Sequence, residues 1–104
     1  MEEGGYVKTF FDGVFLDRDM LEEEGIKYPI KLEYFKTSRD EENVGTTYGI
    51  EIVKTEYLDG NEKIETEEVN NIANNRFEQE RILKILKENK VTPVALQDVI
   101  KEIL

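Results

Sequence analysis

Apolar and polar residues alternate with a period near two along residues 48–69, and an Asp-Gly pair at residues 59–60 interrupts the alternation. A two-residue Asp-Gly loop is typical of a type I′ turn, whose twist suits the strands on either side. This loop length sets Glu56 opposite Lys63, whereas a three-residue loop would set Glu56 opposite Glu62, an unfavourable pair of like charges. The pattern therefore predicts a β-hairpin, and we expect the rest of the domain to be organised around it.

Both faces of this hairpin carry apolar residues. The register set by the two-residue loop also places Lys54 opposite Glu65, a second pair of opposite charge. One face holds Glu51, Val53, Thr55, Tyr57, Ile64 and Thr66, and the other holds Tyr48, Ile50, Ile52, Leu58 and Val69. Because an isolated hairpin is marginal in water, more strands or helices are required. We expect full cover on one face and partial cover on the other.

Two further segments have strand character. Residues 6–15 are rich in β-forming types but contain Asp12-Gly13, which indicates one strand with a bulge or two short strands with a turn. Pro29 precedes an alternating strand over residues 30–37, and the charged segment 38–45 is predicted to be the loop that leads back into the hairpin. Residues 1–5 are predicted to be a frayed end.

Helix signals dominate the C-terminal third. Asparagines after Val69 end the strand pattern, and Asn75 with Glu78 is a capping pair for a helix over residues 76–89. Thr92 followed by Pro93 predicts a second helix start, with threonine as the cap. Its buried stripe follows helical spacing at Leu96, Val99, Ile100 and Ile103. A short helix over residues 19–24 is also predicted, between a cap at Asp17 and Gly25.

Strands followed by helices indicate a segregated α+β fold. We expect a single domain over residues 1–104, with an antiparallel sheet of three or four strands, a meander with a central hairpin, covered by two C-terminal helices. The pattern leaves open whether residues 6–16 add a strand to the sheet.

Composition narrows the possible functions. The chain has 24 acidic and 14 basic residues and a net charge of −10, so it repels a phosphate backbone. Histidine and cysteine are both absent, which removes the commonest general bases, nucleophiles and transition-metal ligands. No apolar run approaches the roughly 20 residues of a membrane helix, and no signal peptide is visible. We expect a cytoplasmic protein with no cofactor and no catalytic residue.

Two rival functions remain open. The first is a carboxylate-based divalent-ion binder or enzyme; the acidic run from Asp17 to Glu24, however, does not match a calcium loop, because Leu21 and Glu22 occupy the fifth and sixth positions. The second is a nucleic-acid-associated protein that acts through the helix at residues 76–90. This helix lies in the C-terminal quarter, residues 76–104, where six bases slightly outnumber five acids. The leading hypothesis is a small acidic protein-interaction or regulatory module without catalysis.

Candidate partner-binding residues lie on that same helix. Arg76, Lys84 and Lys87 project away from its apolar face. Such a basic face fits an acidic protein partner, and the acidic hairpin of a second copy would be one example. A solvated helix face of ordinary kind has the same pattern.

The chain from residue 28 to residue 104 resembles a small family of uncharacterised proteins from Gram-positive bacteria. The residues that carry this resemblance are Tyr48-Gly49-Ile50-Glu51 and the closing Val91-Thr92-Pro93, Leu96 and Asp98-Val99-Ile100. The resemblance implies a shared fold and a bacterial cytosolic protein. It implies no activity, ligand or catalytic residue.

Overall fold

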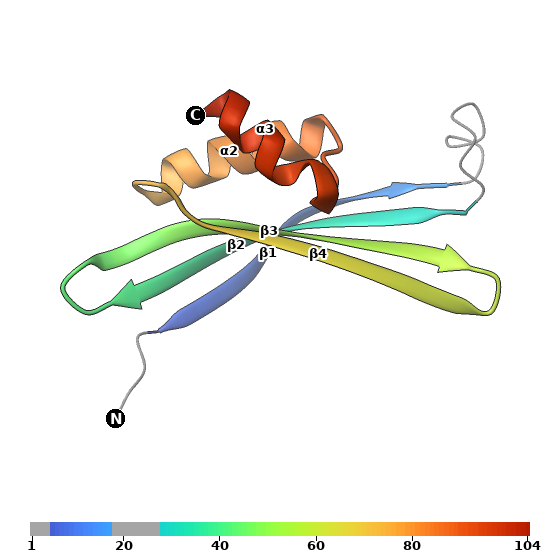
Figure 1. Ribbon diagram of the computed structural model, residues 1–104, viewed down its shortest axis with the longest axis horizontal. Coiled ribbons are helices and arrows are strands. Elements are labelled where there is room, and N and C mark those ends of the chain that lie inside the picture. The colour runs from blue at the N-terminus through green and yellow to red at the C-terminus, as the bar shows by residue number, and fades with distance from the viewer. Residues whose placement is uncertain (1–4, 18–27) are drawn as a thin grey trace.

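The computed structural model describes residues 5–17 and 28–104. Four strands form one antiparallel sheet in the order β1-β2-β3-β4: β1 (Tyr6–Leu16), β2 (Ile30–Glu41), β3 (Gly45–Leu58) and β4 (Asn61–Ala73). They are followed by α2 (Arg76–Glu88), the 3-10 turn η1 (Pro93–Ala95) and α3 (Leu96–Ile103). Both helices lie on the same face of the sheet (Figure 1). The predicted α+β meander is confirmed. The question left open by the sequence is also answered, because residues 6–16 add a strand, β1, to the sheet.

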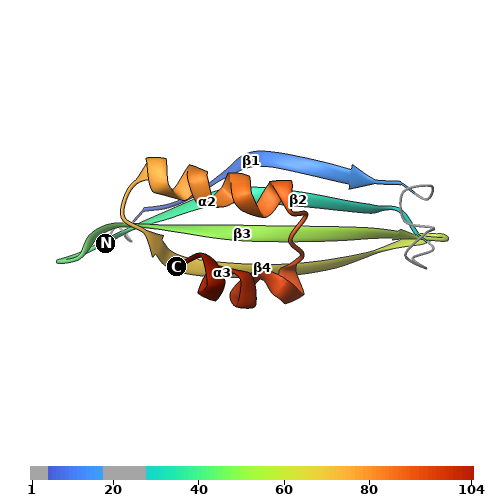
Figure 2. The same ribbon diagram turned by 90° about the horizontal axis from the view of Figure 1, so that it is seen from above.

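The helices divide the covered face between them. Seen from above, α2 overlies β1 and β2, and α3 overlies β4 (Figure 2). The predicted alternation in β2 is confirmed, because Ile30, Leu32 and Tyr34 are buried beneath the helices. They pack with Ile50 and Ile52 of β3, with Ile82, Leu83 and Leu86 of α2, and with Leu96 and Ile100 of α3. The buried stripe predicted for the last helix is therefore part of the core.

The predicted hairpin register is confirmed. Glu56 pairs with Lys63 and Lys54 with Glu65, and Lys54 and Glu65 form an ion pair with 3.4 Å between Nζ and Oε1. The type I′ assignment is wrong, because only Gly60 has a positive φ, at 84°. A positive φ at the second central residue alone is the pattern of a type II turn. Asp59 thus avoids the left-handed region, where a side chain is strained, and Gly60 alone provides the bend.

The segment at residues 38–45 is not the long loop that the sequence predicted. Strand β2 continues to Glu41 and β3 begins at Gly45, so the ladder extends almost to the turn. The Thr46 hydroxyl donates to the Asp40 carboxylate at 2.6 Å, and Asn43 and Gly45 take positive φ values of 68° and 91°. The polar side chains that suggested a loop thus lie on paired strands, and Asp40 and Thr46 are joined by a hydrogen bond between those strands.

Two predicted breaks lie at different positions in the structure. The irregularity in β1 is a bulge at Phe11, between the paired Phe10 and Asp12, rather than a turn at residues 12–13. Gly5, predicted to be part of a frayed end, accepts a hydrogen bond through its carbonyl from the Asp40 amide at 2.9 Å. The predicted helix at residues 19–24 lies outside the described residues.

Strand β4 does not end at Val69. Ile50 pairs with Val69 and Tyr48 with Ala73, so the three residues 70–72 form a bulge opposite the single residue Gly49. Asn71 takes a φ of 54° within it, which asparagine tolerates better than most residues. The asparagines that suggested a strand end therefore mark a bulge inside the strand.

Of the two caps predicted for the C-terminal helices, the one at Asn75 is confirmed. The Asn75 side chain accepts from the Glu78 amide at 2.8 Å, and Glu78 in turn accepts from the Asn74 amide at 2.9 Å. Thr92 makes no side-chain capping bond. The amide of Ala95 donates instead to the Thr92 backbone carbonyl at 3.1 Å, so the chain forms a 3-10 turn before α3 begins. The helical start predicted at Thr92-Pro93 is confirmed, but the capping bond predicted for the Thr92 side chain is wrong.

Candidate functional site

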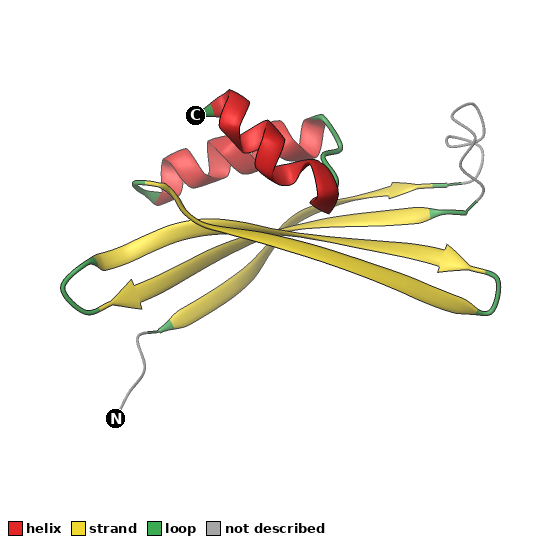
Figure 3. Ribbon diagram, viewed as in Figure 1, coloured by secondary structure: helices red, strands yellow, loops and turns green. Residues whose placement is uncertain are grey.

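The second face of the sheet, which we call the open face, has neither helix on it (Figure 3). The strand pairing aligns its side chains in rows that cross all four strands. One row runs Phe10, Phe35, Glu51, Glu68, and another runs Phe15, Lys31, Thr55, Ile64. This face is the largest surface of the sheet that no described element covers.

Aromatic rings form the apolar part of the open face. Phe10 and Phe35 pack edge to face with centroids 5.7 Å apart, and Phe15 lies 6.2 Å from Tyr57. Phe10 is 53% exposed, Phe15 is 56% exposed and Ile64 is 60% exposed. Several large apolar side chains on one face are more than a scattered set of exposed residues, and such patches are typical of interaction sites.

Charged side chains on the open face are paired within the chain. Lys8 binds Glu51 at 3.2 Å while its ammonium lies 4.4 Å from the centre of the Phe35 ring. Arg39 binds Glu68 at 3.2 Å across the strand between them. Such pairs leave the face with little unbalanced charge along its centre, which lowers the cost of covering it.

Tyr6 joins the same network at the end of β1. Its ring lies 4.3 Å from the Arg39 guanidinium carbon, and its hydroxyl donates to Glu68 at 3.4 Å. Burial and the neighbouring Glu68 carboxylate raise the pKa of Tyr6. The phenol therefore stays protonated and remains a hydrogen-bond donor at neutral pH.

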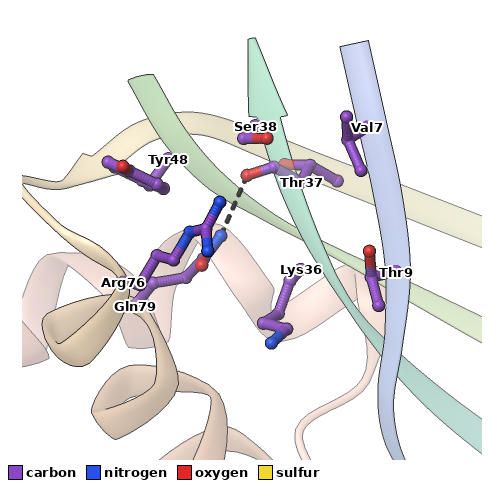
Figure 4. Close-up of a pocket in the computed structure, with 8 residues that line it drawn as sticks. All are labelled: Val7, Thr9, Lys36, Thr37, Ser38, Tyr48, Arg76 and Gln79. Carbon is purple, nitrogen blue, oxygen red and sulfur yellow. Dashed lines mark hydrogen bonds between the residues drawn. The ribbon is translucent and has the colours of Figure 1, made fainter. Parts of the chain in front are cut away.

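A small hollow lies on the helix side, where α2 begins. Its volume is about 160 Å³, and its lining comprises Val7, Thr9, Lys36, Thr37, Ser38, Tyr48, Arg76 and Gln79 (Figure 4). The Arg76 side chain extends from the first turn of α2 toward β2, between Tyr48 and Lys36 (Figure 4). Hydroxyl, amide and cationic groups from three strands and one helix meet here.

Gln79 fixes one wall of this hollow. The residue is 2% exposed, and its side-chain amide donates to the carbonyls of Thr37 at 2.9 Å and Gly49 at 2.8 Å. A Cβ at Gly49 would lie 2.5 Å from the Val69 carbonyl oxygen, so only glycine fits at the bulge. Gln79 thereby joins α2 to β2 and β3 through buried hydrogen bonds.

The structure separates the three predicted partner-binding residues. Arg76 lies at the hollow, whereas Lys87 faces β1 and pairs with Asp12 at 3.5 Å. Lys84 is exposed on the outer side of α2, beside Phe11 and Phe77. Arg76 is thus the one member of the predicted set that lines the hollow.

The hairpin pattern predicts the β3 and β4 half of the open face, as the hairpin face with partial cover, but not its extension across β1 and β2, and no pattern predicts Gln79. The signal for this extension was present, because Tyr6, Lys8 and Phe10 alternate in β1 as Val53, Thr55 and Tyr57 do around Lys54 and Glu56 in β3. No signal marked Gln79, since a glutamine in a charged helix is normally exposed. Among residues 5–17 and 28–104, no group of three or more acidic side chains could hold a metal ion.

No helix in the described part of the chain is long and apolar enough to cross a membrane.

Comparisons with known proteins identify a family but no function. The model of the family described as Family of unknown function (DUF6514) matches residues 14–104, which is most of the chain. The match begins earlier than residue 28, where the resemblance seen in the sequence begins. No curated protein and no solved structure matches the chain.

Proposed function

The chain belongs to DUF6514, a family of unknown function, and we propose that it is a small protein-interaction module without catalytic activity, whose open face binds a second copy of the same chain. The observation that carries this proposal is the set of exposed rings on the uncovered sheet. Phe10 and Phe15 of β1 and Ile64 of β4 are each more than half exposed. We further propose that the module acts in the cytoplasm of a Gram-positive bacterium.

The open face has the area that a dimer needs. A strand of 11 residues, the length of β1, spans about 36 Å, and four strands span about 19 Å, which gives about 700 Å² for one face. Full contact between two such faces would remove about 1,400 Å² from water. Specific protein interfaces bury about 1,200–2,000 Å².

A two-fold axis parallel to the strands makes the face self-complementary. Such an axis places β1 of one copy over β4 of the other and keeps each position along the strands, so Phe15 meets Ile64 of the second copy and Phe10 lies level with Glu68. The open sides of β1 and β2 carry Lys8, Lys31 and Arg39, whereas the open side of β4 carries Glu62 and Glu68 and no base. These bases pair with Glu51, Glu33 and Glu68 within the chain. The base-bearing side of one copy nevertheless lies over the acidic side of the other, which favours this relative orientation.

The other two hypotheses have less support from the described residues. A divalent-ion site or a carboxylate-based enzyme would need acids that converge. The acids of the open face are instead spread along the strands, and Glu33, Glu51 and Glu68 are paired with bases. A nucleic-acid role through residues 76–90 would need an accessible basic helix face, and Lys87 is paired with Asp12. An acidic protein partner for Arg76 and Lys84 stays a prediction beside the proposed self-association.

Sedimentation equilibrium tests the proposal through matched phenylalanine variants. We expect the wild-type protein to approach twice its monomer mass of 12.2 kDa as its concentration rises. Phe10→Ser removes a ring from the β1 side of the open face and should weaken association at least tenfold, as loss of an aromatic anchor does. The control is Phe77→Ser, because Phe77 is 84% exposed but lies on α2, on the opposite side of the sheet.

Two results would contradict the proposal. One is a wild-type protein that keeps the monomer mass to about millimolar concentration, where even weak interfaces associate. The other is a Phe77→Ser protein that loses association as strongly as Phe10→Ser does, since that would place the interface on the helix side. Unchanged unfolding free energies of both variants show that the fold is intact.

A further inference from the structure

We propose that the hollow beside Arg76 is a binding site for a small oxyanion, a phosphate or carboxylate group. The site lies on the helix side of the sheet, so it is independent of the proposed contact through the open face. Its lining includes the cationic residues Arg76 and Lys36 and the hydroxyl-bearing residues Thr9, Ser38 and Tyr48.

The charges around the hollow favour an anion. No carboxylate lines it, although acids outnumber bases 24 to 14 in the chain. Lys36 is partly neutralised by Glu80 at 2.9 Å, whereas Arg76 forms no ion pair with any described residue. Arg76 therefore supplies most of the positive charge that the hollow offers.

The chemistry of the lining matches an oxyanion in detail. A guanidinium is always charged and presents several N–H donors in one plane, which suits a carboxylate or phosphate. Residues with hydroxyl groups from three strands line the same space. A concave surface of one sign also concentrates field lines, so it attracts an anion more strongly than a flat surface does.

The wall of the hollow is held in place before any ligand arrives. Gln79 is buried and bonds to two backbone carbonyls, so the first turns of α2 cannot slide along β2 without breaking both bonds. A fixed wall lowers the ordering cost of binding. The volume of about 160 Å³ admits an oxyanion with its remaining water but no extended molecule.

Titration with inorganic phosphate, followed by the amide signals of the ¹⁵N-labelled protein, tests this site. Chloride at equal ionic strength is the reference, because it removes the effect of general screening. We expect saturable shifts of the Gln79 side-chain amide and the Ser38 backbone amide. Arg76→Gln should weaken the apparent affinity at least tenfold, whereas Arg81→Gln, which removes an exposed arginine from the same helix, should leave it unchanged.

A parallel titration with acetate separates the two sources of the oxyanion. Stronger binding of acetate assigns a carboxylate, and stronger binding of phosphate assigns a phosphate; either result supports the site. The proposal is overturned if neither anion shifts these amides, or if Arg76→Gln and Arg81→Gln weaken binding equally. Because the probes are free anions and lie far from the open face, failure here leaves the sedimentation result unaffected.

Discussion

The ring of Phe10 on β1 packs edge to face against the ring of Phe35 on β2, 5.7 Å away, on the face of the sheet that the helices do not cover. The two residues are direct partners across the strands. A ring on the open side is not part of the core beneath the helices. A small domain gains stability from every apolar side chain it buries, so rings held on the outside support the proposed self-association through this face.

The bonds made by Gln79 should matter for stability. Gln79→Leu removes the donor for the Thr37 and Gly49 carbonyls and leaves both buried acceptors unsatisfied, so it should lower the free energy of unfolding by about 1–3 kcal/mol. Urea unfolding measures the change. Gln97→Leu is the control, because its exposed bond to Glu67 should contribute less than about 0.5 kcal/mol. Equal losses in the two variants would show that the buried bonds have no special role.

Gly49 should tolerate no side chain. Gly49→Ala places a Cβ 2.5 Å from the Val69 oxygen and 2.7 Å from the Thr37 hydroxyl, so strands must move apart at a cost of about 1–3 kcal/mol. At Gly13 the nearest atom, the Leu32 oxygen, would be 3.2 Å away, and we expect Gly13→Ala to cost less. Thermal unfolding compares the two. A Gly49→Ala protein that melts with the wild type would mean that the bulge is absent in solution.

Tyr34 should give stability a dependence on alkaline pH. Its hydroxyl donates to the Val91 carbonyl at 2.9 Å, and burial raises its pKa well above the ordinary value of about 10. Below about pH 10 the proton is bound in both states, so this group adds no slope. Above it the unfolded chain ionises first, and stability falls as pH rises.

Tyr34→Phe tests that expectation. The variant should lose about 0.5–1.5 kcal/mol at neutral pH, because the Val91 carbonyl loses its donor. It should also lose less stability than the wild type between pH 9 and 11, as followed by urea midpoints. Parallel pH profiles for the two proteins would show that the phenol is not buried as described.

The last helix should depend on packing rather than on its cap. Leu96→Ala should cost about 2–5 kcal/mol, since Leu96 is fully buried between α3 and the sheet. Thr92→Ala should change stability by less than about 0.5 kcal/mol, because the hydroxyl makes no capping bond. Calorimetry of both variants separates the two contributions. A loss of about 1 kcal/mol at Thr92 would indicate a cap that forms in solution.

The sequence predicted the sheet well because its signals there are local. Opposite charges at Lys54 and Glu65 fix the hairpin register whatever the tertiary context, and Asn75 with Glu78 acts within one helical turn. The predicted strand ends were wrong because the true ends depend on residues that are distant in the sequence. Strand β4 passes Val69 only because the bulge at residues 70–72 fits against Gly49, and no pattern in the asparagines shows this.

The candidate sites were harder to predict for the same reason. Arg76 was identified as a basic residue on a polar helix face, but its hollow exists only where β1, β2 and α2 meet. The open face required the pairing of all four strands, because Phe10 and Ile64 are 54 residues apart in the chain. Periodicity shows that a side chain is on a given face, and only the fold shows whether a helix covers that face.

Isotope-filtered NOE spectroscopy on an equal mixture of labelled and unlabelled protein tests the central claim most directly. If β1 of one copy lies over β4 of the other, contacts between copies should appear from the Phe15 ring protons to the Ile64 methyl groups, because these residues lie in the same row. Within one chain this ring and these methyls are separated by two strands, or about 14 Å, which is too far for an NOE. Contacts between copies that involve only helix residues such as Phe77, or none in a sample of dimer mass, would contradict the account.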